Sequence, residues 1–370
     1  MSKLIVLRVS EDLNKNNLKN IILTGTSNKN SLAAPDNTLL SKAINNKLQV
    51  DIINNLSDRI NLYKDFLAIL NIYSALKKYQ PKIVHIHSSK TGLLGRILKI
   101  FFKKTHFIYH VHGWSYSRYS GLKKKIFFCL EYFLYYFTDS YIFVCKADLN
   151  EFINMGGPKK ISKISEIIYP GVDFLQPLEI SHHKKKIRNN FSIKNNECLV
   201  GNIARVDHQK DPLLFIRMAA HLKKTSKHTK YKFMWIGEGN LMNECKSLVK
   251  KLRLDNDFIF TGYIEDVNPY FGIFDVFVIS SAYEGLPVTA IKALGSGVPL
   301  SSVAINGLND LNIYKGVNLT YNRTSLELAK CVRKSIIKEY NQYDINIIKE
   351  TFSNKEMLKN IKKNYEKRSR

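Results

Sequence analysis

Short apolar runs alternate with amphipathic patterns along the chain, and residues 274–299 show this most clearly. Residues 276–279 form an apolar, mostly β-branched run whose length fits a strand buried on both faces. After a break, Val288, Ile291 and Leu294 recur at a spacing that places them on one face of a helix. The segment therefore predicts a buried parallel strand, a turn and a helix.

The first half of the chain repeats this alternation. Residues 1–17 have the periodicity of an amphipathic helix, and the alternative interpretation is that Lys3 to Val9 form a first strand. Further strands are expected at 20–24, 48–53, 82–87, 107–112, 140–145 and 167–173, and helices at 65–78, 93–104, 128–137 and 148–155.

The second half follows the same rhythm after a polar linker at 182–186. Strands are expected at 199–203, 232–236, 258–261, 276–279 and 300–303. Helices are expected at 213–222 and 288–294, and another helix follows the turn at 237–239 and ends at 252. A loop at 304–311 and two closing helices, the last at 355–367, complete the pattern. Strands that alternate with helices predict an α/β protein with doubly wound parallel sheets.

Length and charge narrow the class. A chain of 370 residues is long enough for two domains. The net charge of +26 favours an anionic partner, which could be nucleic acid, a phosphorylated ligand or an anionic membrane surface. Because no helix-turn-helix, RRM or zinc-finger pattern is present, we expect no nucleic-acid partner.

Cysteine usage and hydropathy indicate the compartment. The cysteines are widely spaced, odd in number and free of C-x-x-C pairs, which is typical of thiols in a reducing compartment: Cys129, Cys145, Cys198, Cys245 and Cys331. The most apolar segment, 126–145, is interrupted by polar residues and falls short of the roughly 20 apolar residues that span a bilayer. We expect a cytoplasmic protein, peripheral at the cytoplasmic face of the inner membrane.

A basic and aromatic face is one basis for that expectation. The aromatic helix at 128–137 follows Lys123, Lys124 and Lys125, and the preceding helix carries further cations at Arg96, Lys99, Lys103 and Lys104. This composition suits anionic headgroups. The alternative interpretation is a helix with an apolar core side and a solvated lysine run.

Two strand-to-helix turns carry candidate chemistry. Arg205 and Lys210 stand five residues apart after the strand at 199–203, a spacing that lets both cations converge on one diphosphate. The turn at 280–288 precedes a helix, whose free N–H groups and dipole attract an anion. The alternative is that the second turn is an ordinary βα connection.

The sequence of the second turn and its helix, EGLPVTAIKAL followed by GVP, resembles the signature of family 4 of the retaining GT-B glycosyltransferases. That signature is a glutamate, seven residues and a second glutamate. Glu284 matches the first position, whereas Lys292 stands at the second. In the family, the second glutamate accepts hydrogen bonds from the nucleotide's ribose hydroxyls, whereas a lysine ammonium has donors and no acceptor. The loss of one such charged hydrogen bond costs about 1.5–3 kcal/mol. The alternative is that Lys292 donates to a hydroxyl oxygen or helps to hold phosphate, so that nucleotide binding is retained.

The resemblance implies a GT-B architecture, in which two Rossmann-like domains face each other across a cleft. The expected domains are residues 1–175 on the acceptor side, 176–350 on the nucleotide-sugar side, and a terminal helix at 351–370 that packs back on the first domain. Family members begin with a strand and a glycine-rich loop, and we expect both to be missing ahead of residues 1–17.

The resemblance also implies roles for individual residues. His112 and Glu284 match the residues that contact the donor sugar, and Arg205 and Lys210 match the pair that binds the diphosphate, with Ala204 in place of a glycine. Because a lone histidine is more often structural than functional, we interpret His85, His87 and His110 as packing residues, independently of the resemblance. The donor site is completed by residues that match the family's nucleotide contacts: Gly262, Tyr263, Gly285, Leu286, Pro287, Val288 and Lys292. No metal and no cofactor are expected.

The function implied is a retaining transfer of a sugar from a nucleotide sugar, such as a UDP- or GDP-sugar, in surface polysaccharide biosynthesis. The acceptor is expected to be a glycan or a polyprenyl-linked sugar. The alternative is a catalytically impaired GT-B protein, either a decayed gene product or a partner of an active transferase, which Lys292 and the short N-terminus favour. An epimerase on the same fold is a further alternative without specific support.

Overall fold

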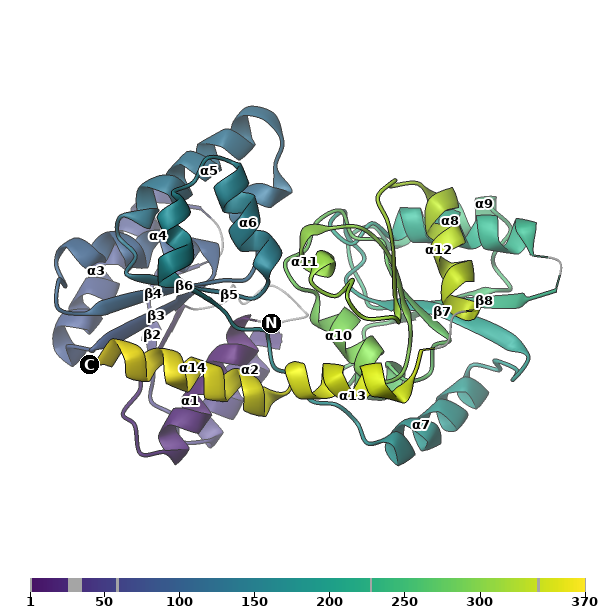
Figure 1. Cartoon of the computed structure of the whole chain (residues 1–370), viewed down its shortest axis with the longest axis horizontal. Helices are drawn as coiled ribbons and strands as arrows, with labels where there is room; N and C mark the ends of the chain where they lie inside the picture. The colour runs from purple at the N-terminus through teal and green to yellow at the C-terminus, as the bar shows by residue number, and fades with distance from the viewer. Residues whose placement is uncertain (1, 26–34, 58–59, 227, 338–339, 370) are drawn as a thin grey trace. The chain divides into compact units, whose positions relative to one another are not determined.

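The computed structural model describes residues 2–25, 35–57, 60–226, 228–337 and 340–369. The chain divides into two compact units (Figure 1). The first unit consists of Met1–Gly171 and Asn354–Arg370, and the second of Val172–Ser353. Each unit is an α/β structure with parallel sheets, as the alternation of strands and helices predicts.

The second unit is a doubly wound sheet with the strand order β12-β11-β10-β7-β8-β9. All of its ladders are parallel. From β7 the chain adds β8 and β9 on one side, and it then adds β10, β11 and β12 on the other side, so that the strand order switches between the neighbours β7 and β10. Ligands of such sheets bind at this switch point. The strands are β7 (Glu197–Ile203), β8 (Lys230–Ile236), β9 (Phe258–Gly262), β10 (Val276–Ile279), β11 (Leu300–Val303) and β12 (Val317–Thr320).

Helices cover both faces of this sheet (Figure 1). α8 (Pro212–Thr225), α9 (Met242–Lys251) and α12 (Ser325–Ile337) enclose a core in which Phe215, Trp235 and Leu328 are fully buried. α10 (Val288–Gly295) contacts β10, β11 and α13 on the other side. The remaining helices of the unit are α7 (Pro177–Asn190), η4 (Asn268–Tyr270), α11 (Asn306–Asn309) and α13 (Gln342–Thr351).

The first unit contains two parallel sheets. β1 (Ile22–Gly25) pairs with β2 (Val50–Ile53), and the larger sheet has the order β3-β4-β5-β6. Leu23 of β1 and Ile86 of β3 both pack into one core with α3. The larger sheet is formed by β3 (Ile83–His87), β4 (His106–Val111), β5 (Ser140–Phe143) and β6 (Ser165–Ile167).

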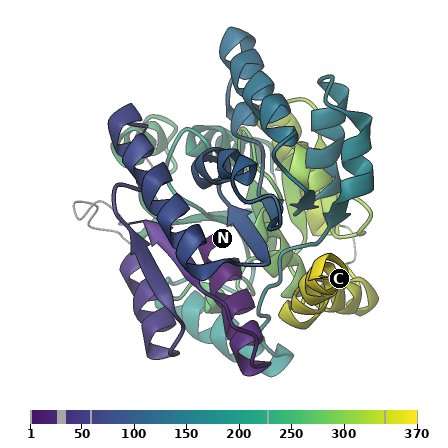
Figure 2. The same ribbon diagram turned by 90° about the vertical axis from the view of Figure 1, so that its left-hand side faces the viewer.

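The helices of the first unit cover both faces of the larger sheet (Figure 2), except the helix Pro35–Asn45, whose Ala43 packs with Ile22 and Val50 of the smaller sheet. They are α1 (Ser2–Lys15), α2 (Pro35–Asn45), α3 (Leu62–Tyr79), α4 (Ser89–Ile97), η1 (Leu98–Ile100), η2 (Ser115–Arg118), α5 (Gly121–Tyr135), α6 (Lys146–Asn154), η3 (Lys159–Ile164) and α14 (Asn354–Ser369). Because side chains alternate along a strand, Phe107 and Tyr109 of β4 enter the core with α3, α4 and α5. Ile108 packs instead against α1 and α14.

Several boundaries differ from the sequence prediction. Residues 2–15 are helical, so the alternative of a first strand at Lys3 to Val9 is wrong. The polar linker predicted at 182–186 lies inside α7, where Pro177 takes the first turn and the Glu179 carboxylate accepts a 2.8 Å hydrogen bond from the Gln176 N–H. α7 has few apolar residues, and its helical periodicity is therefore weak in the sequence.

The last part of the chain also contains more helices and strands than predicted. The loop expected at 304–311 contains α11, and β12, α12 and α13 precede the terminal helix α14, so the prediction of two closing helices is wrong. Met357 and Ile361 of α14 pack with Ile5 and Val9 of α1 in the first unit. Among the described residues, every helix is too short or too polar to cross a membrane.

Candidate functional site

The loops that follow β7 and β10 meet at the switch point of the second unit. The two strands are parallel neighbours, so their carboxyl ends lie at the same edge of the sheet. The Ala282 N–H donates to the Gln209 carbonyl at 2.7 Å, and the Ser280 hydroxyl donates to the Lys210 carbonyl at 2.9 Å. These bonds hold the two predicted turns together.

Lys210 and Glu284 form an ion pair at this junction. The Lys210 ammonium donates to Glu284 Oε1, and the side chains are only 20% and 10% exposed. Gln209 Nε2 donates to the Tyr283 carbonyl at 3.2 Å and lies 3.5 Å from Glu284 Oε2, which it also contacts as a donor. Two residues 74 positions apart in the sequence, each predicted for the donor site, are thus brought into direct contact.

Arg205 lies in the same loop but extends toward solvent. Its side chain is 68% exposed, and Nη2 lies 3.0 Å from Asp207 Oδ2 and 3.2 Å from Gln209 Oε1. Exposed ion pairs of this kind hold a side chain weakly. The guanidinium can therefore turn to a diphosphate and grip two of its oxygens.

The start of α10 completes the junction. Pro287 occupies the N-cap position, and no side chain caps the helix among the described residues. Leu286 is fully buried, which fixes the loop, and a Cβ at Gly307 would lie 1.7 Å from the Gly285 carbonyl oxygen. Only glycine at 307 allows this approach. The helix start, with the dipole that favours anions, is thereby held beside Glu284.

Lys292 and the loop after β9 lie further along the same edge. The Lys292 ammonium donates to Asn268 Oδ1 and lies 5.6 Å from the centre of the Phe271 ring. Gly262 has a φ of +74°, and its carbonyl accepts a 2.9 Å hydrogen bond from the Gly237 N–H. Tyr263 is 55% exposed. The structure therefore places Lys292 on a protein partner of its own, apart from the pair formed by Lys210 and Glu284.

His112 belongs to the first unit, directly after β4. Its Nε2 lies 2.9 Å from Nδ1 of His87, and Gly113 follows with a φ of +109°. Burial and the neighbouring His87 lower the pKa of His112 well below its ordinary value, so the ring is neutral. The donor-sugar contact assigned to His112 stays a prediction.

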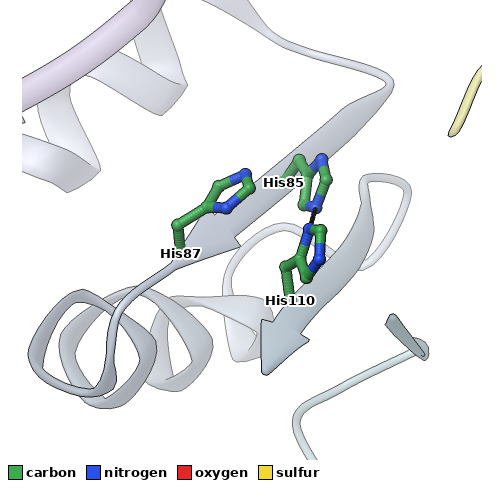
Figure 3. Close-up of side chains that lie close together, drawn as sticks. All are labelled: His85, His87 and His110. Carbon is green, nitrogen blue, oxygen red and sulfur yellow. Dashed lines mark hydrogen bonds between the residues drawn. The ribbon is translucent and has the colours of Figure 1, made fainter. Parts of the chain in front are cut away.

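The structure also shows a cluster that the sequence interpretation missed. His85, His87 and His110 project from β3 and β4 toward one another (Figure 3), and their ligand-capable nitrogens all lie within 4.8 Å. Burial lowers the pKa of His87 to about 3. The available signal was the alternation of histidine at 85 and 87 in one strand and at 110 and 112 at the end of the next. This alternation, with the pairing of the two strands, places all four imidazoles on one face.

Comparison with known families agrees with the fold. A model of the family described as Glycosyl transferases group 1 matches residues 183–368, and a model of Glycosyltransferase Family 4 matches residues 6–174. Together with the two parallel-sheet units, these matches define a glycosyltransferase of the GT-B class. The chain belongs to the group 1 glycosyl transferases of family 4.

Characterised relatives come from bacterial glycan biosynthesis. A UDP-Gal:α-D-GlcNAc-diphosphoundecaprenol α-1,3-galactosyltransferase of Escherichia coli is 29% identical over 279 residues, which cover 74% of this chain and 70% of that protein. The O-antigen biosynthesis glycosyltransferase WbnH of the same species is 26% identical over 77% of this chain and 75% of its own length. A Campylobacter jejuni N-acetylgalactosaminyltransferase that acts on an undecaprenol-linked glycan is 38% identical over 31% of this chain and 32% of its own length.

Solved structures share the fold. The Anabaena protein Alr3699/HepE in complex with UDP superposes with a TM-score of 0.77 at 17% identity, covering 99% of this chain and 96% of that one. The sucrose-phosphate synthase of Thermosynechococcus elongatus gives a TM-score of 0.76 at 15% identity, covering 98% and 92%. The architecture is therefore shared beyond detectable sequence similarity.

Proposed function

We propose that this glycosyltransferase moves a sugar from a UDP-sugar to a polyprenyl-diphosphate-linked glycan, with retention of the anomeric configuration, during surface polysaccharide biosynthesis. One observation carries the proposal: Arg205, Lys210, Glu284 and the start of α10 meet at the switch point of the second unit. Such an edge suits a nucleotide diphosphate.

The proposed chemistry is electrostatic. As the bond between the sugar and the diphosphate breaks, negative charge grows on the leaving phosphate oxygens. Arg205, Lys210 and the dipole of α10 offset that charge, and no metal is needed for this task. Binding of the diphosphate draws the Lys210 ammonium from Glu284, which frees the carboxylate to accept hydrogen bonds from hydroxyls of the sugar.

The choice of UDP and of a lipid-linked acceptor is supported by the relatives. The E. coli relative is named for UDP-Gal and a diphosphoundecaprenol acceptor, and the Anabaena structure contains UDP. This chain's own residues support the diphosphate contacts, whereas the nucleotide base and the acceptor are inferred from the relatives. We therefore propose the uridine donor over GDP- and ADP-sugars.

A lipid-linked acceptor requires access to a membrane surface, and α5 supplies a candidate face. The face consists of apolar side chains at helical spacing, 54–74% exposed, and of two exposed lysines next to them. The apolar residues are Leu122, Ile126, Phe133 and Tyr136, and the lysines are Lys123 and Lys125. An exposed apolar stripe flanked by lysines suits an anionic interface. Arg96 does not belong to this face, contrary to the sequence interpretation, because it is fully buried against Glu131.

The test is a transfer assay with purified protein, UDP-hexoses and a short-chain polyprenyl-diphosphate-GlcNAc acceptor, with the product's anomeric configuration read by NMR. We expect transfer with retention, and a decrease of about 10- to 100-fold in Glu284→Gln, which removes a charged contact to the sugar. Inversion would contradict the mechanism. UDP binding without transfer to any acceptor would instead support the alternative of an impaired transferase.

A further inference from the structure

Four histidines occupy one face of the β3–β4 ladder. His85 and His87 alternate along β3, and His110 and His112 continue the same alternation at the end of β4, with His87 in register with His110. Stacked rings fill the face: the His85 and His110 rings are 5.2 Å apart with planes 3° apart, and those of His110 and His112 are 4.3 Å apart. The same face carries Ile83 and Ile108 nearer the start of the strands, where the apolar core with α1 and α14 lies.

Two of these imidazoles have a partner on Nδ1. Nδ1 of His85 contacts the Tyr365 hydroxyl of α14, and Nδ1 of His87 lies 2.9 Å from Nε2 of His112. With each Nδ1–H as donor, Nε2 of His85 and Nε2 of His87 each carry a lone pair, and Nε2 of His85 lies 3.2 Å from Nδ1 of His110. Metal-binding histidines are held in this way, because the second ring nitrogen donates to an outer partner that fixes the tautomer.

His110 closes the cluster from the neighbouring strand. It is only 2% exposed; Nδ1 lies 3.2 Å from Nε2 of His85, and Nε2 is buried with no hydrogen-bond partner among the described residues. A neutral imidazole always carries one lone pair and one N–H, so one polar atom of this buried ring is unsatisfied in the protein alone. A cation that accepts a lone pair would relieve this.

We propose that His85, His87 and His110 bind one late first-row transition-metal dication of the Zn²⁺ class, with Tyr365 and His112 as outer hydrogen-bond partners. The ligand-capable nitrogens already lie within 4.8 Å of one another. In a tetrahedral site with Zn–N bonds of about 2.0–2.1 Å, ligand nitrogens stand roughly 3.3 Å apart, so small side-chain rotations complete the geometry.

The donor set selects the kind of metal. Three neutral imidazoles without a carboxylate suit Zn²⁺, Cu²⁺ or Ni²⁺, whereas Mg²⁺ and Ca²⁺ require oxygen ligands. Three histidines also leave one coordination position for water or another small ligand. The three proposed ligands belong to the first unit, whereas the residues proposed for the diphosphate belong to the second unit.

The experiment uses untagged, full-length protein, stripped with a chelator and titrated with ZnCl₂ and, separately, CoCl₂. We expect one equivalent of Zn²⁺ per chain by calorimetry and an intense visible absorption from Co²⁺ in a tetrahedral site. X-ray absorption of the Zn²⁺ form should show at least three imidazole ligands. Weak, octahedral Co²⁺ absorption, or fewer than three imidazoles, would overturn the proposal without the use of any variant.

Variants then assign the ligands. His110→Asn and His85→Gln should weaken Zn²⁺ binding at least about 100-fold, and His112→Asn, which removes an outer partner, about 10-fold. The matched control is His182→Asn with His183→Asn, because this neighbouring pair in α7 is the obvious site for adventitious binding. Equal loss in the control, or unchanged binding in a His110→Asn protein that keeps its circular dichroism spectrum, would refute the assignment. UDP affinity is read separately, so failure here leaves the proposed function untouched.

Discussion

At the scale of single residues, the ion pair of Lys210 and Glu284 explains how the site holds opposite charges without a ligand. Both side chains are mostly buried, and each neutralises the other; in the proposed function, a diphosphate competes for the ammonium. Lys292 has no such relation to the pair, because it bonds to Asn268 in η4. We therefore expect the departure from the family's second glutamate to affect ribose recognition and to leave the proposed phosphate contacts in place.

The first prediction concerns this position. Lys292→Glu should raise UDP affinity about 10- to 100-fold, because a carboxylate can accept hydrogen bonds from ribose hydroxyls and a lysine cannot. Calorimetric titration measures the change, with Lys292→Met as the control that removes the ammonium without adding an acceptor. An equal gain in both variants would mean that loss of the lysine, and not the new carboxylate, is responsible.

Sequence reasoning reached some of these residues and not others. Arg205 and Lys210 could be found from their spacing after a strand, whereas the contact of Lys210 with Glu284 depends on which strands are neighbours. The histidine cluster was missed for the same reason: the register of β3 with β4 is a long-range property that local periodicity does not contain.

At the scale of elements, a buried ion pair joins α4 to α5. Arg96 Nη2 lies 2.6 Å from Glu131 Oε2, with side chains 0% and 4% exposed. Arg96 Nε also donates to the Gly92 carbonyl at 2.7 Å, and the guanidinium stacks 3.9 Å from the centre of the Tyr109 ring. This pair explains why a charged residue interrupts the most apolar segment of the chain.

The second prediction follows from that burial. Glu131→Ala should lower the free energy of unfolding of the first unit by about 3–5 kcal/mol, because it leaves Arg96 buried without a counter-charge. The matched control is Lys367→Ala, which breaks a 2.7 Å pair with Glu166 whose side chains are 51% and 26% exposed, and should cost less than about 1 kcal/mol. Urea unfolding in a Trp235→Phe background, where Trp114 is the remaining tryptophan and reports the first unit, measures both losses, and similar losses would contradict this expectation.

Element boundaries show where local patterns suffice. β10 was predicted at its observed limits, because it is a buried apolar run that ends at Ser280. β11 was also predicted at its limits, although it contains Ser301 and Ser302. α5 starts at Gly121, seven residues before the prediction, since Lys123 to Lys125 conceal its first turn. Apolar runs thus mark strands well, and exposed helix ends poorly.

At the scale of the whole molecule, we expect the net charge of +26 and the exposed stripe of α5 to favour binding to an anionic membrane together. Long-range attraction brings a basic protein to an anionic surface, and the apolar side chains then enter the interface. The electrostatic attraction and the apolar insertion are each weak alone. They can be separated by experiment, because salt weakens the attraction and substitution of the apolar side chains removes the insertion.

The third prediction is that the protein floats with liposomes containing anionic lipid, and that this binding weakens as salt is raised, because charges near the surface are screened. Ile126→Ser with Phe133→Ser should reduce binding several-fold. Leu326→Ser is the control, since Leu326 is also exposed, at 45%, but lies in α12 outside the stripe. Binding that is indifferent to anionic lipid would refute the membrane role.

The central claim is that Arg205 and Lys210 form the phosphate site of a UDP-sugar donor, and calorimetric titration with UDP, GDP and ADP tests it most directly. We predict micromolar binding of UDP in preference to the other two nucleotides, and a loss of at least about tenfold in Arg205→Ala, because each cation contributes a charged hydrogen bond. UDP binding that is unchanged in Arg205→Ala and Lys210→Ala would contradict the account.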